Sequence, residues 1–186
     1  VVDLVDENRV FVKKGLEKIN NTTNIGLNEL LTECEIQDKK IGVYHLGFII
    51  GPCINASGRL DNAKKGVRLL LSDDEKEAVL LAKELVKLNE ERKEMTMNGV
   101  EEAIEIVENT SIRNDKVFVI YLPHIHESLA GIIAGRIREK YNVPTLILTK
   151  SEDGAKGSGR SIEEYNMFEE LVKCKDLLEK FGGHPM

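Results

Sequence analysis

The stretch KVFVIYLPHIHESLAGIIAGRIREKYNVPTLILT, residues 116–149, decides the fold class of this sequence. Its two ends, residues 116–122 and 143–149, are short apolar runs rich in β-branched residues, which is typical of buried strands. Between them, residues 127–141 carry apolar side chains at helical spacing. A strand, a helix and a second strand in this order predict a parallel strand pair joined by a right-handed crossover, and therefore an α/β fold.

Residues 73–108, which precede this unit, are predicted to form one long helix, because apolar residues recur at helical spacing near both of its ends. At 1.5 Å per residue such a helix is about 54 Å long. Its middle, NEERKE at residues 89–94, has no apolar side chain and so has no core to join. We therefore predict that the helix bridges two domains, residues 1–72 and 109–186. The alternative is a break near Gly99, with two shorter helices packed back on each other.

A glycine-rich segment, GSGRS, follows the second strand. Gly157 and Gly159 leave room for a ligand to approach the backbone, whose successive N–H groups in a turn can form an anion site. Ser158 and Ser161 add hydroxyl donors, and Arg160 offers a planar fork that matches phosphate oxygens. The composition fits a loop that binds phosphate. An ordinary solvent-exposed loop is the other interpretation of the same composition.

The same segment differs by one residue from a nucleotide-binding P-loop, because residues 154–161 read GAKGSGRS. Arg160 stands where that motif has lysine. No aspartate ends either predicted strand, so the pattern lacks the magnesium ligand that such an enzyme uses. We therefore disfavour a nucleoside triphosphatase.

A second segment places polar groups next to glycines. Residues 51–59, GPCINASGR, carry Asn55, Ser57 and Arg59 close behind an apolar run. Buried polar groups need partners, and a ligand is one such partner. A capped turn between two helices is the other interpretation of this segment.

His124 and His126 follow the first strand, at the start of the helix predicted over residues 127–141. The amino-terminal end of a helix favours anions, and ligands of open α/β sheets bind at the carboxyl ends of the strands. A histidine pair could also bind a metal, but the pattern shows no third ligand. Gly131 and Gly135 lie four residues apart, and we interpret them as allowing close packing of the helix.

The sequence ends in FGGHPM. We expect a helix over residues 163–181 that stops at Gly182 in a left-handed cap. Gly183 and His184 follow, and the histidine is a further polar candidate. The start at Val1 and the abrupt end lead us to expect a piece of a longer protein.

Composition narrows the function classes. The net charge is −6, and residues 73–111 carry 12 acidic and 5 basic side chains, so no broad basic patch is predicted. No apolar run approaches the length of a membrane span, and no signal peptide opens the sequence. Cys34, Cys53 and Cys174 form no Cys-x-x-Cys pair. This argues against a zinc site or a disulfide framework and favours a reduced, cytoplasmic setting.

Taken in order, these segments resemble the RecJ-type single-strand-specific exonucleases of the DHH phosphoesterase superfamily. VVDLVDENRVFVKKGL, at the start of the chain, resembles the stretch that follows the family's last metal-binding aspartate. GFIIGPCINASGRL, residues 47–60, resembles the family's G-P-R-x-N-A-A-G-R signature, and LNEERKE resembles its interdomain helix. HESLAGIIAGRI, AKGSGRS and FGGHPM resemble successive signatures of the DHH-associated domain. The resemblance covers essentially the whole chain.

The resemblance implies a fold and an activity. The fold would be the helical end of a DHH domain (residues 1–72), a bridging helix (73–108) and an α/β DHH-associated domain with a mixed sheet (109–186). The activity would be 5′-to-3′ hydrolysis of single-stranded DNA in repair and recombination. Two metal ions, Mn²⁺ or Mg²⁺, would be held by Asp and His residues in the N-terminal part of the DHH domain. The partner would be single-stranded nucleic acid, DNA in preference to RNA, and no membrane.

The resemblance also assigns roles to residues. The candidates for phosphate and backbone binding are Asn55, Arg59, Ser158, Arg160, Ser161 and His184. Arg59, Ser158 and Arg160 correspond to residues that hold the 5′ phosphate and backbone of the DNA, and the others lie in the same signatures. Further candidates beside them are His126, Gly157, Gly159, Gly182 and Gly183.

This sequence departs from the family pattern at several positions. Cys53 stands where the signature has arginine, which removes one cationic contact and leaves the strength of backbone binding open. Ser57 replaces an alanine, Asp3 replaces a proline, and Glu127 and Ser128 replace a common Pro-Gly pair.

The metal-binding D-x-D, D-H-H and final Asp of the family would all lie before Val1. We therefore expect no catalytic residue, no metal site and no nuclease activity in this chain alone. Two alternatives remain for the parent protein. One is a DHH-family oligoribonuclease or cyclic-dinucleotide phosphodiesterase, relatives that tend to lack the long bridging helix. The other is a catalytically inactive nucleic-acid-binding relative.

Overall fold

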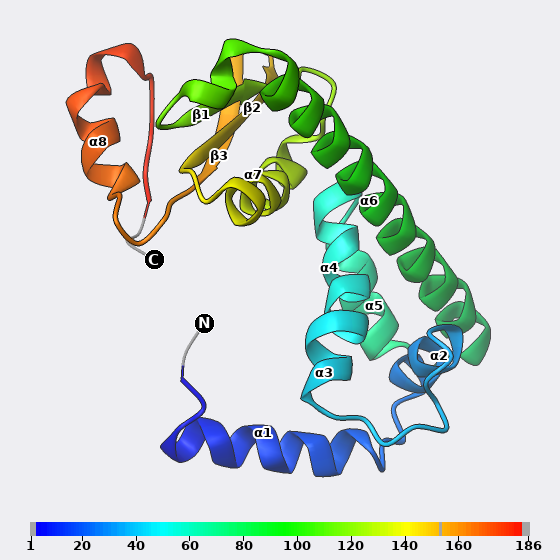
Figure 1. Ribbon diagram of the computed structural model, residues 1–186. Coiled ribbons are helices and arrows are strands. Elements are labelled where there is room, and N and C mark those ends of the chain that lie inside the picture. The colour runs from blue at the N-terminus through cyan, green and yellow to red at the C-terminus, as the bar shows by residue number, and fades with distance from the viewer. Residues whose placement is uncertain (1–2, 153, 184–186) are drawn as a thin grey trace. The chain divides into compact units, whose positions relative to one another are not determined.

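The computed structural model describes residues 3–152 and 154–183. The chain forms two compact units, Val1–Arg92 and Lys93–Met186 (Figure 1). The division falls inside the longest element, α6 (Glu75–Asn109). The assignment of residues 1–72, 73–108 and 109–186 to parts of known domains stays a prediction.

Helix α6 is a single helix of 35 residues, so the alternative with a break near Gly99 is wrong. Gly99 is buried in the core of the second unit. A Cβ atom at this position would lie only 2.6 Å from Ile133 Cδ1. Most of residues 89–94 are exposed, as their composition suggests, but Asn89 is not. Asn89 is only 4% exposed, because it continues the buried side of the helix one turn after Leu85.

Every element described in the first unit is helical. Its elements are α1 (Asp6–Ile19), α2 (Ile25–Glu33), α3 (Val43–His45), a π-helical turn (Leu46–Ile50), α4 (Gly51–Leu60), α5 (Lys64–Leu71) and the first part of α6. Leu30, Leu69 and Leu85, from three different helices, are fully buried in its core. Asn24 caps α2, because its side chain accepts a hydrogen bond from the backbone N–H of Leu27.

Residues 43–60 form consecutive helical turns without a gap, so the interpretation of residues 51–59 as a turn between helices is wrong. Within the π-helical turn, the N–H of Gly51 donates to the carbonyl of Leu46, five residues back. The wider turn comes directly before Pro52, which has no N–H to continue the ordinary hydrogen-bond ladder. The sequence lacked a regular apolar period here because the helix changes its pitch.

The second unit is α/β, as predicted. Its elements are the second part of α6, a 3₁₀ turn (Ser111–Asn114), β1 (Phe118–Tyr121), α7 (Glu127–Tyr141), β2 (Thr145–Ser151), β3 (Gly154–Arg160), α8 (Met167–Lys173) and a 3₁₀ turn (Lys175–Leu177). The strand order is β1-β2-β3, with β1 parallel and β3 antiparallel to β2. The predicted strand–helix–strand unit and the mixed sheet are both confirmed.

The core of the second unit lies between the sheet and two helices. Helix α7 packs on β2 and β3, and Val107 of α6 joins the same buried cluster as the sheet residues. Phe118, Ile120 and Ile147 of the sheet are at most 2% exposed. Because side chains alternate along a strand, one face of the sheet buries these residues while Val119 on the other face stays exposed.

Residues 157–161 were predicted to form a loop, and this conformation was wrong, because all of them except Ser161 lie in β3. Residues 154–160 pair antiparallel with β2, with Ser158 opposite Ile147 and Arg160 opposite Thr145. An anion site made of successive N–H groups requires a turn in which they converge, whereas in a strand they point alternately to opposite sides. The same observation excludes a P-loop, whose glycines form a loop that opens a helix.

The helix expected over residues 163–181 is shorter than predicted. α8 ends at Lys173, and a 3₁₀ turn follows. The left-handed cap at Gly182 was wrong, because Gly154 is the one glycine with positive φ in the described part of the chain. Gly182 and Gly183 are both exposed. His184 lies outside the described residues.

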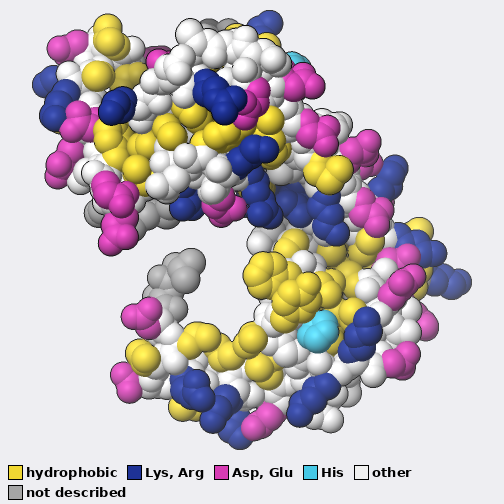
Figure 2. Space-filling view, viewed as in Figure 1, with side chains coloured by type: hydrophobic (Ala, Val, Ile, Leu, Met, Phe, Trp, Pro, Cys, Tyr) yellow, Lys and Arg dark blue, Asp and Glu magenta, His cyan; other side chains and the backbone are white. Residues whose placement is uncertain are grey.

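Helix α1 buries none of its residues. Phe11 of this helix is 73% exposed. Tyr44 of α3 and Phe48 of the following π-helical turn are also exposed, and their rings stack at a centroid distance of 5.1 Å. Figure 2 shows hydrophobic side chains on the surface over α1 and α3. None of the helices in the described residues is both long and apolar enough to cross a membrane.

Candidate phosphate-binding site

Strand β3 presents two chemically different faces. Gly157 and Gly159 lie on one face, where they pack tightly. A Cβ atom on Gly157 would lie 2.9 Å from the carbonyl oxygen of Ile147, and one on Gly159 would lie 2.4 Å from Met167 Sδ. We therefore ascribe to these two glycines a role in packing, and not in the approach of a ligand. Lys156, Ser158 and Arg160 alternate with them and lie on the other face.

Ser158 and Arg160 lie against helix α7. A Cβ atom on Gly131 would lie 2.8 Å from Ser158 Oγ and 3.0 Å from Arg160 Nη2. Arg160 Nη1 donates to the carbonyl of Gly159 at 2.8 Å, which uses one of its five N–H groups. Within residues 3–152 and 154–183, no carboxylate forms an ion pair with Arg160. The charge of this half-buried side chain is thus available to an anion.

Lys156 lies on the same face of β3 and is already paired. Its Nζ atom lies 3.0 Å from Glu127 Oε2, in the first turn of α7. The hydrogen bond to Glu127 raises the pKa of Lys156 above its ordinary value. Glu127 is one of the residues that depart from the family pattern, and here it neutralises a cation beside Ser158.

The other candidates of the second unit have internal roles. Ser161 Oγ donates to the carbonyl of Tyr165, so its hydroxyl closes a local turn. His126 is the N-cap of α7, and its Nδ1 atom lies 2.8 Å from Ser128 Oγ. His124 Nε2 lies 2.8 Å from a Glu102 carboxylate oxygen. The two histidines therefore contact separate partners and do not form a metal-binding pair.

In the first unit, Asn55 and Arg59 lie one turn apart on α4, with Asn55 exposed and Arg59 half-buried. Ser57, between them, is not a ligand candidate. It is fully buried, and its hydroxyl donates to the carbonyl of Ile54 at 2.9 Å. The polar group that sequence reasoning offered to a ligand is satisfied inside the protein.

Sequence reasoning missed Arg92. Its Nε and Nη2 atoms donate to Asn89 Oδ1 at 3.1 and 2.9 Å, and Asn89 Nδ2 lies 3.4 Å from Cys53 Sγ. Burial lowers the pKa of Arg92, and the nearby positive charge of Arg59 lowers it further. The available signal was the spacing of Asn89, which falls one helical turn after Leu85 on the buried side of α6.

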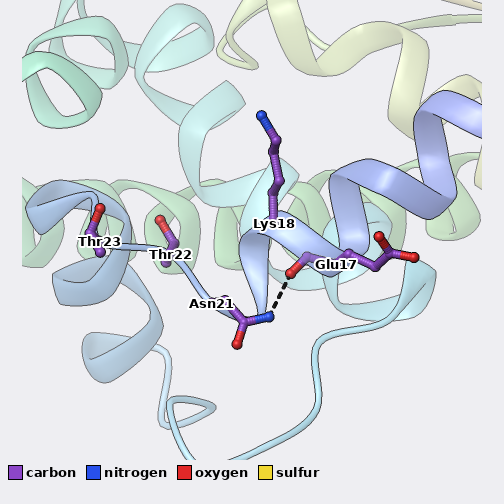
Figure 3. Close-up of a pocket in the computed structure, with 5 residues that line it drawn as sticks. All are labelled: Glu17, Lys18, Asn21, Thr22 and Thr23. Atoms are coloured by element: carbon purple, nitrogen blue, oxygen red, sulfur yellow. Dashed lines mark hydrogen bonds between the residues drawn. The ribbon is translucent and has the colours of Figure 1, made fainter.

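A shallow hollow at the end of α1 lies apart from these residues in the sequence. It is lined by Glu17, Lys18, Asn21, Thr22 and Thr23. Figure 3 shows Asn21 Nδ2 donating to the carbonyl oxygen of Glu17, at 2.9 Å, while the Lys18 side chain extends away from this bond. None of the predicted site residues lines it, and we assign it no function.

Metal chemistry would need a set of donors that this part of the chain does not provide. Among the described residues, no cluster of three or more His, Cys, Asp or Glu side chains could hold a metal ion. The residues do not fit the two-metal centre that the resemblance implies, so we derive no step through metal ions here.

Comparison with known proteins gives three consistent findings. Residues 114–186 match the DHHA1 domain family. The whole chain is 38% identical to the single-stranded-DNA-specific exonuclease RecJ of Bacillus subtilis and 36% identical to that of Escherichia coli. A crystal structure of RecJ from Thermus thermophilus in complex with Mg²⁺ superposes with a TM-score of 0.85 over 99% of the chain, at 33% identity. An exonuclease RecJ bound to manganese gives 0.80 over 97%, at 32% identity.

These relatives are much longer than this chain. The chain spans 24% of the Bacillus protein and 34% of the Escherichia protein. It covers 28% of the Thermus structure and 44% of the manganese-bound structure. The resemblance seen in the sequence is confirmed, as a match to one segment of such proteins.

Proposed function

Since this chain corresponds in sequence and fold to a segment of the RecJ-type exonucleases, we propose that it binds the 5′ phosphate and backbone of single-stranded DNA in such an enzyme. Under this proposal, residues 1–72 are the helical end of a DHH domain and residues 73–108 form the interdomain helix. Residues 109–186 are the DHH-associated domain. Arg59 and Asn55 act from the first, and Ser158 and Arg160 act from the last.

One observation carries this proposal: the guanidinium group of Arg160 lies beside the hydroxyl of Ser158 and pairs with no described carboxylate. A planar guanidinium can donate two parallel hydrogen bonds to one phosphate, and a hydroxyl can donate a third. A half-buried site strengthens such charge-assisted bonds relative to open solvent. The pair Arg59 and Arg92 supports the proposal, because the repulsion between two nearby cations is offset when an anion binds.

The parent enzyme is proposed to be a 5′-to-3′ exonuclease of DNA repair and recombination in the cytoplasm. Mn²⁺ or Mg²⁺ would supply the activation of water and the stabilisation of the leaving oxygen. The metal ligands would lie in a part of the parent that this chain does not include, so the chain alone should bind DNA without cleaving it. The other candidates are a DHH-family oligoribonuclease, a cyclic-dinucleotide phosphodiesterase and an inactive nucleic-acid-binding relative.

Fluorescence anisotropy with short oligodeoxynucleotides tests the proposal. The wild-type chain should prefer a 5′-phosphorylated oligonucleotide over its 5′-hydroxyl counterpart. Arg160→Ala should weaken binding of the phosphorylated form by roughly 10- to 100-fold, which corresponds to about 1.5–3 kcal/mol for a charge-assisted contact. Arg136→Ala is the matched control, because this exposed arginine of α7 pairs only with Glu139 in the described residues.

Equal affinity of the wild-type chain for the two ends would overturn the phosphate role. A preference for RNA of the same sequence, or for a cyclic dinucleotide, would favour the alternative phosphodiesterases. Cleavage of DNA by contaminant-free chain with Mn²⁺ would contradict the absence of catalytic residues.

A further inference from the structure

The side chain of Arg160 crosses two glycines on one side of α7. A Cβ atom on Gly135 would lie 3.9 Å from Arg160 Cγ, and one on Gly131 would lie 3.0 Å from Nη2 and 3.5 Å from Cζ. The aliphatic stem of the arginine thus lies over one helical turn and its guanidinium group over the preceding turn. Ser158 Oγ also lies over Gly131, at 2.8 Å from the position that a Cβ atom would take there.

Gly131 differs from the glycines that serve packing. At Gly157 the nearest atoms are an apolar side chain and the backbone of Ile147, and at Gly99 they belong to isoleucines of the core. At Gly131 the three nearest atoms all belong to the polar ends of Ser158 and Arg160. The absence of a side chain at this position therefore leaves room specifically for the two groups that would bind phosphate.

We propose that Gly131 is a positioning residue: it seats the Ser158 hydroxyl and the Arg160 guanidinium against the backbone of α7, in the orientation that binds a terminal phosphate. This inference deepens the proposed function and rests on it. A glycine inside a helix is less favourable than alanine, so α7 is less stable than it could be at this position. The benefit is the fixed geometry of the donors, because misplaced donors lose most of the gain of preorganisation.

The test compares Gly131→Ala with Gly135→Ala. Both variants add the same methyl group to the same helix, one turn apart. At Gly135 the methyl group meets only an ordinary contact at 3.9 Å, whereas at Gly131 Ser158 Oγ and Arg160 Nη2 must move. We expect the ratio of affinities for 5′-phosphate and 5′-hydroxyl oligodeoxynucleotides to fall by about tenfold in Gly131→Ala and to stay within about twofold in Gly135→Ala.

The ratio is the decisive measurement, because a loss of folded protein lowers both affinities equally and leaves their ratio unchanged. Thermal unfolding is measured in parallel. The atoms that the methyl group added in Gly131→Ala would meet are the ends of two side chains that can rotate, so this variant is expected to fold. Its thermal midpoint should equal or exceed that of the wild type.

The double variant Gly131→Ala/Arg160→Ala completes the cycle. If Gly131 acts through Arg160, the substitution of Gly131 should lower the ratio little further once the guanidinium is gone. If Gly131→Ala alone does not fold, recovery of folding in the double variant supports the steric conflict. Failure of both variants to fold would instead show that Gly131 serves the general packing of α7, and would overturn the inference.

The two hypotheses fail in different ways. A wild-type ratio of one contradicts the phosphate role itself. A high ratio in the wild type that is lost in Arg160→Ala but kept in Gly131→Ala contradicts only the role of Gly131. An equal loss of the ratio in Gly131→Ala and Gly135→Ala also overturns the role of Gly131. Such a result would show that any larger side chain on this side of α7 has the same effect.

Discussion

Asn89 accepts hydrogen bonds from two nitrogen atoms of Arg92, Nε at 3.1 Å and Nη2 at 2.9 Å. Its own amide group lies 3.4 Å from Cys53 Sγ, so one buried carboxamide links the cysteine of α4 to the arginine of α6. The guanidinium is thereby held on the side of the helix that faces the first unit, where Arg59 influences its pKa.

Asn89→Ala should lower the free energy of unfolding by about 1–3 kcal/mol, because it removes the acceptor of a partly buried charged group. It should also weaken DNA binding, since Arg92 loses its orientation. Asn98→Ala is the control, because Asn98 is exposed on the same helix and shares the change in helix propensity. Urea unfolding of the two variants measures the difference. Equal stabilities would show that the Asn89–Arg92 contact does not contribute.

Cys53→Arg restores the arginine of the family signature and should destabilise this chain. Cys53 is 2% exposed, and its Sγ atom lies 3.8 Å from Cys34 Sγ. It also influences the pKa of Arg92, the arginine that Asn89 holds. A second guanidinium here would be a buried charge close to Arg92, and we expect a loss of roughly 3 kcal/mol or more. Cys174→Arg, at an exposed cysteine, is the control and should change stability by about 0.5 kcal/mol at most.

The behaviour of Cys53→Arg also shows why this chain has cysteine where the family signature has arginine. Tighter DNA binding by a stably folded Cys53→Arg variant would show that the cysteine merely omits a cationic contact. Loss of folding without a gain in affinity would show that the surroundings of Cys53 have adapted to a small side chain.

Gly26→Ala and Gly15→Ala form a matched pair in the helices of the first unit. A Cβ atom on Gly26 would lie 1.7 Å from the carbonyl oxygen of Leu69, whereas one on Gly15 would meet no described atom within 4 Å beyond the backbone of its own helix. Gly26→Ala should destabilise the chain by about 1–3 kcal/mol or more, because α2 and α5 must separate. Gly15→Ala should stabilise it by about 0.5–1 kcal/mol through helix propensity. Chemical denaturation distinguishes the two, and stabilisation by Gly26→Ala would refute the close contact.

Glu77 should make the first unit sensitive to acid. The hydrogen bond from Arg68 is the main cause that lowers the pKa of Glu77, and the hydrogen bond from Ser72 lowers it further. A carboxyl group with a depressed pKa in the fold stabilises the protein above its unfolded pKa of 4.5 and loses that contribution as the pH falls through the folded value. Glu77→Gln should therefore reduce stability at pH 7 and remove part of the decline below pH 4.5.

Glu101→Gln serves as the control on the same helix, because no ion pair is described for Glu101. Thermal midpoints measured between neutral and acidic pH check the prediction. Parallel pH profiles of wild type and Glu77→Gln would contradict it.

Much of the fold followed from local pattern. The strand–helix–strand unit was predicted because residues 116–149 carry clear strand and helix periods, and α6 was predicted because its apolar positions recur near both of its ends. The prediction failed where tertiary packing outweighs composition. Gly157 and Gly159 are unusual in a strand, yet here only glycine fits against Ile147 and Met167.

The candidate site also contains residues that the sequence suggested and one that it did not. Arg59, Ser158 and Arg160 became candidates because glycine-flanked donors suit phosphate and because they match a known signature, and their role stays a prediction. Arg92 was missed, because the polar composition of residues 89–94 hides the one available signal, the helical spacing of Asn89 after Leu85.

The sequence by itself determined the α/β class of the second unit, the long helix and the resemblance to RecJ-type exonucleases, because each depends on periodicity or on the order of short motifs. Only the tertiary structure decided that residues 154–160 form a strand, that Gly157 and Gly159 serve packing, and that Gly131 lies under Ser158 and Arg160. These facts depend on contacts between residues up to 29 positions apart in the chain, from Gly131 to Arg160. Local composition does not contain that information, because it is the packing of α7 on β3 that creates it.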